Sequence, residues 1–218
     1  MNDEVAVERK VLGENDRIAS ELRAEFAKKR ALVINIISSP GAGKTLLLEK
    51  TLQRVDRGSR VAILTGDLQT ENDANRLARA GFPVKQIITG NSCHLDAAMI
   101  KKHLTNWPSD GFDLLIIENV GNLVCPAGYD LGEMAKVVIL SVTEGEDKPL
   151  KYPSVFVKAK LMVLSKIDLL PHVSFDTELA KRNARQVHPG IEIIELSSVT
   201  GLGVNKWMEW IRRQRDEA

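Results

Sequence analysis

The chain has 218 residues, of which 44% are hydrophobic and 27% are charged, so it can form a soluble domain with a sizeable core. Its 30 basic and 29 acidic residues give a formal net charge of +1. The chain therefore lacks the excess of basic residues with which proteins bind the phosphates of nucleic acid. No apolar run approaches the roughly 20 residues of a membrane span and the first residues are polar, so we expect a cytoplasmic protein that binds neither nucleic acid nor membrane.

The first 30 residues predict a leader and one amphipathic helix. Ile18, Leu22 and Phe26 recur at every fourth position, which places them on one face of a helix, and charged residues fill the other faces. Asn15 or Asp16 is a plausible cap at its start. We expect this helix to rest on a single domain formed by residues 31–218.

From residue 31 onward, apolar runs alternate with helical stretches. Most of the runs are continuously apolar and rich in Val and Ile, as in strands that are covered on both faces. The predicted strands are 32–37, 61–64, 84–88, 114–117, 137–142, 161–164 and 191–196. The predicted helices are 44–55, 72–79, 95–104, 175–187 and 204–215. This alternation predicts an α/β fold of three layers, in which helices flank a mostly parallel sheet.

A phosphate-binding loop follows the first of these strands. Its signature is Ser38-x-x-Gly41-x-Gly43-Lys44-Thr45, with Ser38 where the usual motif has Gly. Backbone amides would face the phosphates, Lys44 would reach the β- and γ-phosphates, and Thr45 would ligate Mg²⁺. The predicted nucleotide-binding residues of this loop are Gly41, Ala42, Gly43, Lys44, Thr45 and Leu46. An ordinary glycine-rich turn is disfavoured, because strand, loop, Lys-Thr and helix occur in order.

Three carboxylates are candidates for Mg²⁺ binding and, together with Lys44, for catalysis. Glu118 ends an apolar strand, and Gly121 after it would sense a γ-phosphate through its amide. Asp67 and Asp73 follow the second strand and would complete the Mg²⁺ shell or polarise the attacking water. Two other interpretations stay open: Glu118 as an exposed carboxylate at a strand end, and Asp73 as an acidic residue in the first turn of a helix.

The late segment Ser165-Lys166-Ile167-Asp168 predicts recognition of guanine. The Asp168 carboxylate would accept hydrogen bonds from N1 and N2 of guanine, which adenine does not offer, and the Lys166 stem would lie over the base. Ser197 and Ser198, at the end of the next strand, would border the base with their backbone. Together with the phosphate loop, these residues indicate a GTPase.

The two cysteines lie beside these nucleotide motifs. Cys93 precedes His94, and Cys125 follows the Glu118 segment; thiolate and imidazole ligands suit Ni²⁺ or Zn²⁺. We expect no disulfide in a reducing cytoplasm, and two small buried hydrophobes are the alternative. Side chains of consecutive residues diverge, which makes it hard for Cys93 and His94 to bind one ion together. Three protein ligands also leave a tetrahedral ion without its fourth ligand. Water or a second subunit would supply the fourth ligand, and a site shared across a two-fold axis would meet that need.

Five segments together carry a resemblance to a known family: 38–45, 66–74, 89–97, 118–126 and 141–149. With them the chain resembles the SIMIBI class of P-loop GTPases and, more specifically, the hydrogenase nickel-incorporation GTPases of the HypB family. The resemblance implies a nickel metallochaperone in the maturation of nickel–iron hydrogenase, which forms a homodimer in the GTP state. It also implies two partners, a nickel accessory protein of the HypA family and the hydrogenase large subunit.

Some members of that family carry a Cys-rich or His-rich N-terminal stretch. Here the first cysteine is Cys93 and there are four histidines, so we expect metal handling to rest on the internal site. Because Glu118 and Cys125 are close in sequence, a γ-phosphate-dependent movement of residues 118–121 would reposition Cys125 and change metal binding. Asn122 stands where many GTPases carry a water-orienting Gln, which predicts slow intrinsic hydrolysis.

Three other functions compete with this interpretation. A urease accessory G protein would place Cys, Pro and His together, whereas Ala127 follows Cys125-Pro126. A zinc sensor or metal-dependent dimerisation module, in which GTP is structural, would show no multiple turnover. A GTPase chaperone of a cobalamin enzyme gives no reason for the pair Cys93-His94.

Overall fold

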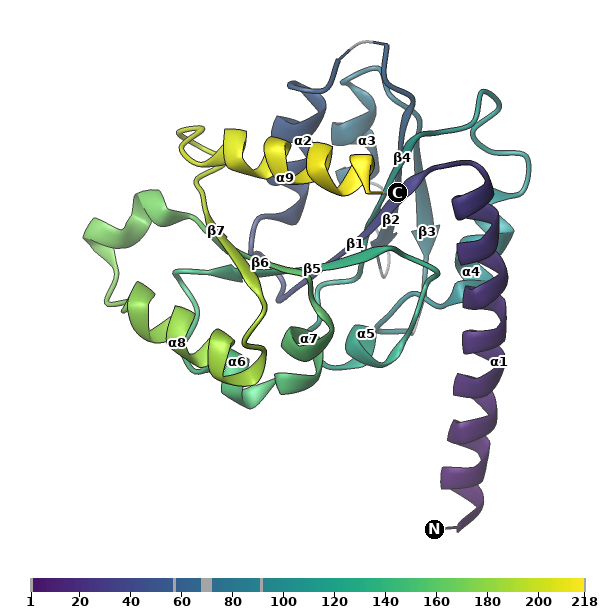
Figure 1. The fold of residues 1–218 in the computed structure, drawn as a ribbon, viewed down its shortest axis with the longest axis horizontal. Helices are drawn as coiled ribbons and strands as arrows, with labels where there is room; N and C mark the ends of the chain where they lie inside the picture. Colours follow the sequence, from purple (N-terminus) through teal and green to yellow (C-terminus); the bar gives the residue numbers. More distant parts are fainter. Residues whose placement is uncertain (1, 57, 68–71, 91, 218) are drawn as a thin grey trace.

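The computed structural model describes residues 2–56, 58–67, 72–90 and 92–217, with side chains from residue 10 onward except at positions 72 and 73. Seven strands of these residues form one sheet (Figure 1). They are β1 (Leu32–Ser38), β2 (Val61–Asp67), β3 (Val84–Ile88), β4 (Leu114–Glu118), β5 (Ala135–Ser141), β6 (Leu161–Ser165) and β7 (Glu192–Glu195). Their order is β3-β2-β4-β1-β5-β6-β7 and each neighbouring pair is parallel, so all carboxyl ends lie at one edge.

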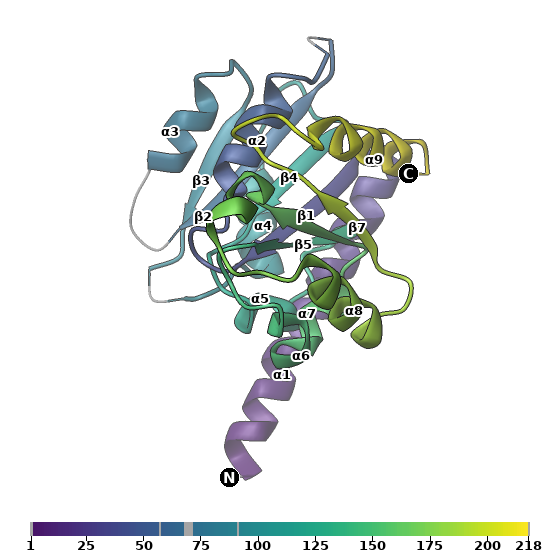
Figure 2. The same cartoon turned by 90° about the vertical axis from the view of Figure 1, so that its left-hand side faces the viewer.

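Helices cover both faces of this sheet, as Figures 1 and 2 show. One face carries α2 (Lys44–Leu52), α3 (Asn72–Ala78) and α9 (Val204–Asp216). The other carries α1 (Asn2–Lys28), α4 (Ala97–Leu104), α7 (Pro153–Lys158) and α8 (Thr177–Val187). The predicted three-layer α/β fold with a parallel sheet is therefore confirmed.

The strands are mostly apolar because both faces of the sheet are covered. In β1, Ile34 and Ile36 pack with side chains of α2 and α9, while Val33, just before them, packs with α1 and α4 on the other face. Successive side chains of a strand point to opposite faces, so a sheet with helices on both sides needs an apolar residue at nearly every position. This is why the seven strands were evident in the sequence.

Helix starts and short helices differ from the prediction. Helices α4 and α8 begin two residues later than expected, because the side chains of Asp96 and Asp176 accept hydrogen bonds from the amides of Met99 and Leu179 and cap them. The sequence prediction missed four elements, α5 (Cys125–Gly128), α6 (Lys148–Lys151), α7 and the 3₁₀ helix η1 (Ile167–His172). Each is too short to show an apolar repeat.

Helix α1 begins at Asn2, so the predicted cap at Asn15 or Asp16 is wrong. Asn15 is buried within the helix and joins it to two loops: its Nδ2 donates to the carbonyl of Asp130 at 2.9 Å, and its Oδ1 accepts from the amide of Ala97 at 2.9 Å. A polar residue with such partners resembles a cap in sequence but serves as a tertiary contact. Of the predicted apolar face, Leu22 and Phe26 are fully buried and Ile18 is partly buried, and Ala19 is buried beside them.

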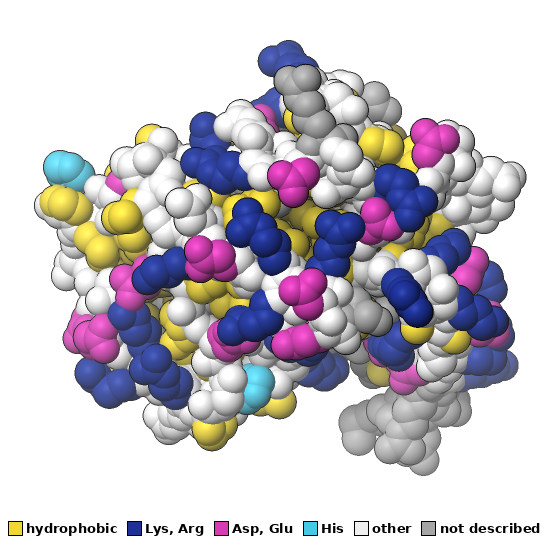
Figure 3. All heavy atoms as spheres, turned by 45° about the horizontal axis from the view of Figure 1, so that its top comes forward, with side chains coloured by type: hydrophobic (Ala, Val, Ile, Leu, Met, Phe, Trp, Pro, Cys, Tyr) yellow, Lys and Arg dark blue, Asp and Glu magenta, His cyan; other side chains and the backbone are white. Residues whose placement is uncertain are grey.

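Among the described residues, no helix is long and apolar enough to cross a membrane. On the face of the molecule seen in Figure 3, Lys and Arg side chains alternate with Asp and Glu. Several charged side chains of the molecule form ion pairs, for example Arg76 with Glu49 and Arg60 with Asp113. The mixed surface agrees with the net charge of +1.

Candidate functional site

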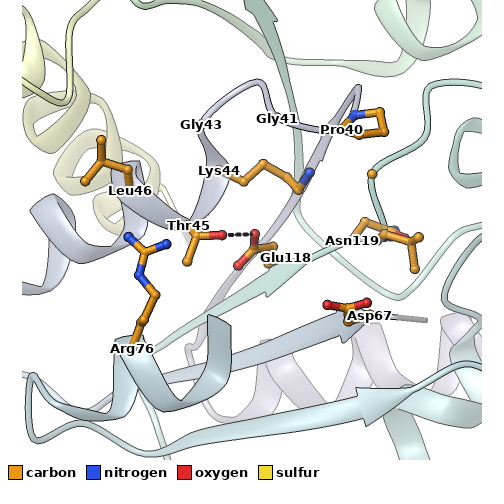
Figure 4. A pocket seen from close by; sticks show the side chains of 13 residues that line it. Pro40, Gly41, Gly43, Lys44, Thr45, Leu46, Asp67, Arg76, Glu118 and Asn119 are labelled. Atoms are coloured by element: carbon orange, nitrogen blue, oxygen red, sulfur yellow. Dashed lines mark hydrogen bonds between the residues drawn. The ribbon is translucent and has the colours of Figure 1, made fainter. Parts of the chain in front are cut away.

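A cavity of about 430 Å³ opens at the carboxyl ends of β1, β2 and β4 (Figure 4). This is the edge at which open parallel sheets bind ligands. Its walls are the loop between β1 and α2, the end of β2, and the segment after β4. The predicted site residues that line it are Gly41, Gly43, Lys44, Thr45, Leu46, Asp67, Glu118 and Gly121.

The loop between β1 and α2 has the geometry of a phosphate cradle. Gly41 and Gly43 have φ angles of 71° and 101°, a left-handed region that glycine adopts without strain. A Cβ added to Gly41 would find no heavy atom within 4 Å, so the space beside it is open to a ligand. The Lys44 ammonium donates to Ser38 Oγ at 2.9 Å, which holds the lysine across the loop. Ser38, the departure from the usual motif, thus supports the lysine.

The Thr45 hydroxyl and the Glu118 carboxylate meet at one wall of the cavity. Thr45 Oγ1 donates to Glu118 Oε1 at 2.8 Å, and Asp67 faces the same space from the end of β2 (Figure 4). Hydroxyl and carboxylate oxygens are the hard ligands that Mg²⁺ prefers, so this set fits a magnesium ion. Glu118 is only 4% exposed, so its interpretation as an exposed strand-end carboxylate is wrong. The side chain of Asp73 lies outside the described residues.

The segment after β4 lies against the phosphate loop. A Cβ at Gly121 would come within 3.0 Å of the Cα of Pro40, so glycine is needed for this approach. Asn122 does not line the cavity; its Nδ2 donates to the carbonyl of Cys93 at 3.4 Å and its Oδ1 accepts from the amide of Val124 at 2.9 Å. Gly121 is therefore placed to meet a terminal phosphate, whereas Asn122 is directed toward the loop of Cys93.

The predicted guanine-binding residues stand at the ends of β6 and β7, beside the cavity rather than in its lining. Ser165 Oγ donates to the carbonyl of Ala42 at 2.8 Å, which ties this segment to the phosphate loop. Asp168 Oδ1 is buried and has no hydrogen-bond partner among the described residues. An unsatisfied buried acceptor is costly, so a ligand with two N–H donors, as guanine has, fits this carboxylate.

Lys166 and the two serines complete this region. A Cβ at Gly43 would lie 4.0 Å from Cε of Lys166, so the lysine stem runs alongside the phosphate loop. Ser197 is buried, and its Oγ accepts from the amide of Thr200 at 3.1 Å, which shapes the turn after β7; Ser198 follows, half-buried. The structure thus brings the predicted residues of the two strand ends next to the phosphate loop.

Cys93, His94 and Cys125 form a second cluster, whose ligand atoms all lie within 4.8 Å of one another. The two sulfur atoms are 2.6 Å apart with both thiols free, and His94 Nδ1 lies 3.8 Å from Cys93 Sγ. The prediction that consecutive side chains diverge is wrong here, because Nδ1 is the ring nitrogen nearer the backbone. The three ligands therefore converge within one chain, and a second subunit is needed only for the fourth position of a tetrahedral ion.

The surroundings of this cluster orient the imidazole. The His94 ring stacks on the ring of Tyr129 with centroids 3.8 Å apart, and Tyr129 follows the helix α5 that begins at Cys125. Burial lowers the pKa of His94, opposed by the charge of Asp96, which favours the neutral form that binds metal. The hydrogen bond to Cys125, together with burial, raises the pKa of the Cys93 thiol.

Arg76, Tyr129 and Asn119 are among the residues of these sites that sequence analysis missed. Arg76 of α3 lines the nucleotide cavity and pairs with Glu49, and nothing in its sequence context indicates this. Tyr129 was missed because aromatic stacking on a metal ligand has no sequence pattern. Asn119 lines the cavity beside Glu118; its place in the motif was visible, but its hydrogen bonds were not.

Comparison with known proteins identifies the family of the chain. Residues 32–195 match the family model described as the nucleotide-binding domain of CobW/HypB/UreG. The hydrogenase maturation factor HypB of Escherichia coli K12 is 52% identical over 209 residues, which cover 96% of this chain and 72% of that protein.

Two solved structures complete the comparison. The crystal structure of HypB from Helicobacter pylori in complex with nickel has a TM-score of 0.88 and 37% identity, and the match covers 94% of this chain and 96% of that one. The signal recognition particle 54 kDa protein of Aeropyrum pernix, solved with GDP, has a TM-score of 0.55 over 77% of this chain and 41% of that one. At 15% identity the latter likeness concerns the fold alone.

Proposed function

The chain belongs to the CobW/HypB/UreG family of P-loop GTPases, within it to the hydrogenase maturation factors HypB, and on this premise we propose that it hydrolyses GTP to control nickel transfer during maturation of nickel–iron hydrogenase. The observation that carries the proposal is the convergence of Cys93, His94 and Cys125 in loops that adjoin the nucleotide cavity. Nickel is the expected cargo because a HypB relative has been solved in complex with it, and Zn²⁺ fits the same ligands.

The hydrolytic site needs little covalent chemistry from the protein. The loop amides and Lys44 bind the phosphates, and Asp168 selects guanine. Mg²⁺, held by Thr45 and Glu118, would supply charge stabilisation at the phosphates as water attacks and GDP leaves. We assign the orientation of that water to Asp67, which lines the same cavity, with Asp73 as the other candidate. Because Asn122 is engaged with the loop of Cys93, we expect slow intrinsic turnover.

The metal cluster supplies three ligands from one chain. We propose that a second copy of the chain, or water, provides the fourth, and that the dimer forms in the GTP state. An accessory protein of the HypA family would exchange nickel with this site, and the hydrogenase large subunit would receive it directly or indirectly. These steps would take place in the cytoplasm.

The proposal is tested with purified protein and with a bacterium that lacks its hydrogenase maturation GTPase. The wild-type chain is expected to hydrolyse GTP over many turnovers, to bind one Ni²⁺ per chain, and to restore hydrogenase activity. Lys44→Ala should abolish turnover and Cys125→Ala should lower nickel affinity by about 10-fold or more. His172→Ala, at an exposed histidine of η1, is the matched control and should do neither. A wild-type chain that binds GTP without turnover would instead support the zinc sensor or dimerisation module.

A further inference from the structure

We propose that Asn119 is a positioning residue that couples the nucleotide cavity to the metal cluster through Leu95, the residue after the metal ligand His94. The inference rests on the proposed function, since it concerns communication between its two sites. It assigns the coupling to the Cys93-His94 loop, whereas the sequence had suggested a movement of Cys125.

One oxygen atom of Asn119 joins the two sites. Its Oδ1 accepts from the amide of Leu95 at 3.2 Å and from the amide of Val120 at 3.0 Å. Val120 lines the nucleotide cavity next to Gly121. A terminal phosphate that draws the backbone of Val120 and Gly121 toward itself would therefore also displace the acceptor on which the Leu95 amide depends.

Buried polar contacts fix the Asn119 side chain. It is 1% exposed, and its Nδ2 donates to Oδ1 of Asn35 at 3.2 Å. Asn35 is fully buried in β1, and its own Nδ2 donates to Oε1 of Glu133 at 3.3 Å. A side chain held in such a chain of hydrogen bonds cannot rotate freely without leaving buried groups unpaired. A backbone shift at residue 119 is thus passed on to Leu95 rather than absorbed.

Leu95 also contacts the other wall of the cavity. Its side chain is fully buried, and a Cβ added to Gly66 would lie 2.9 Å from its Cγ and Cδ1. Gly66 precedes Asp67 at the end of β2, and both line the cavity. The residue next to His94 is therefore held by a hydrogen bond to the segment after β4 and by packing on the end of β2. Both of these segments face the phosphates.

The test compares Ni²⁺ affinity with GDP and with a non-hydrolysable GTP analogue. We expect the two dissociation constants to differ in the wild type. In Asn119→Ala their ratio should move toward one by about fivefold, since the neutral hydrogen bond that joins residue 119 to the Leu95 amide is lost. If that variant does not fold, Asn119→Ser keeps a short acceptor for Val120 but cannot reach Leu95. The thiolate–nickel absorption bands in the two nucleotide states should become alike in either variant.

Asn183→Ala is the matched control. It removes another buried amide, whose Nδ2 donates to the carbonyl of Glu146 at 2.9 Å, away from both sites. The wild-type ratio should be retained in this variant. A ratio that collapses there as well would overturn the inference, because general loosening of the fold would explain both results.

Two further outcomes separate the inference from the function on which it rests. A wild-type ratio that persists in both Asn119 variants overturns the inference and leaves nucleotide control of nickel intact. A wild-type ratio of one overturns the nucleotide control itself. Hydrogen exchange of the Leu95 amide in the unmodified protein gives an independent measurement: its rate should change by about fivefold between the two nucleotide states, and equal rates overturn the inference.

Discussion

Asp168→Asn gives a sharp test of guanine recognition. The change is isosteric, so it keeps the shape of the site and alters only charge and donor pattern. Asp168 Oδ1 is buried and has no hydrogen-bond partner among the described residues, which means that no intramolecular contact of that oxygen is lost. The free energy of unfolding of the nucleotide-free protein is therefore expected to stay the same or to rise.

GTP binding is expected to weaken strongly in this variant. The carboxylate would accept two hydrogen bonds from guanine, each worth about 1.5–3 kcal/mol because the acceptor is charged. An asparagine keeps one acceptor and turns an NH₂ group toward the second donor, so we expect a loss of about 3–4 kcal/mol, or roughly 100- to 1,000-fold in affinity. Xanthine carries an oxygen where guanine carries that second donor, so xanthosine triphosphate should bind the variant better than GTP does.

Titration calorimetry with GTP, ATP and xanthosine triphosphate measures all three affinities. Asp176→Asn is the matched control: Asp176 caps α8 by accepting from the amide of Leu179 at 2.8 Å, and it lies on the surface. Its replacement should leave all nucleotide affinities unchanged. If Asp168→Asn binds GTP with the affinity of the wild type, or if its affinity for xanthosine triphosphate does not exceed its affinity for GTP, then Asp168 does not recognise the base.

Three further predictions follow from named contacts. Gly121→Ala places a Cβ 3.0 Å from the Pro40 backbone, so we expect GTP turnover to fall by about 100-fold while metal binding persists, measured by phosphate release and nickel titration. Tyr129→Ala removes the ring stacked on His94 and should weaken Ni²⁺ by about 10-fold, whereas Tyr129→Phe should not; equal effects would exclude stacking as the cause. Burial would raise the pKa of Asp130, but hydrogen bonds from Arg23 and the Gly132 amide keep the pKa below its usual value. The ionised Asp130 therefore contributes fully to the free energy of unfolding above its unfolded pKa of about 3.9, and this contribution is lost as the pH falls through the folded pKa. We expect Asp130→Asn to be about 0.5 kcal/mol less stable than the wild type at pH 7 and equally stable in strong acid. Urea unfolding at the two pH values measures this difference.

The sequence predicted best those features that depend on neighbouring residues in the chain. The phosphate loop is one unbroken segment, and its strand and helix are coded by local apolar patterns, so Lys44 and Thr45 were placed correctly in the cavity. The start of α1 was missed because a buried Asn15 that binds Ala97 and Asp130 is indistinguishable, in sequence, from a cap. Local patterns carry no information about partners more than 80 residues away.

The metal cluster could be predicted only in part. The sequence showed which residue types would bind the metal, but their convergence depends on a close approach of two loops that only the fold supplies. Cys93 follows β3 and Cys125 follows β4, and β2 lies between these strands in the sheet. The loop of Cys93 must therefore cross the end of β2 to reach Cys125.

Gly66 is what permits that crossing. It stands at the end of β2, and because it has no side chain, Leu95 can pack directly on its backbone; a Cβ there would lie 2.9 Å from the leucine. The same strand end carries Asp67 into the nucleotide cavity. The missing side chain at Gly66 thus lets the loop of Cys93 lie against a wall of the nucleotide cavity. Communication between the two sites then requires no long pathway, since Leu95 touches both segments that line the nucleotide cavity and is bonded directly to the candidate metal ligand His94.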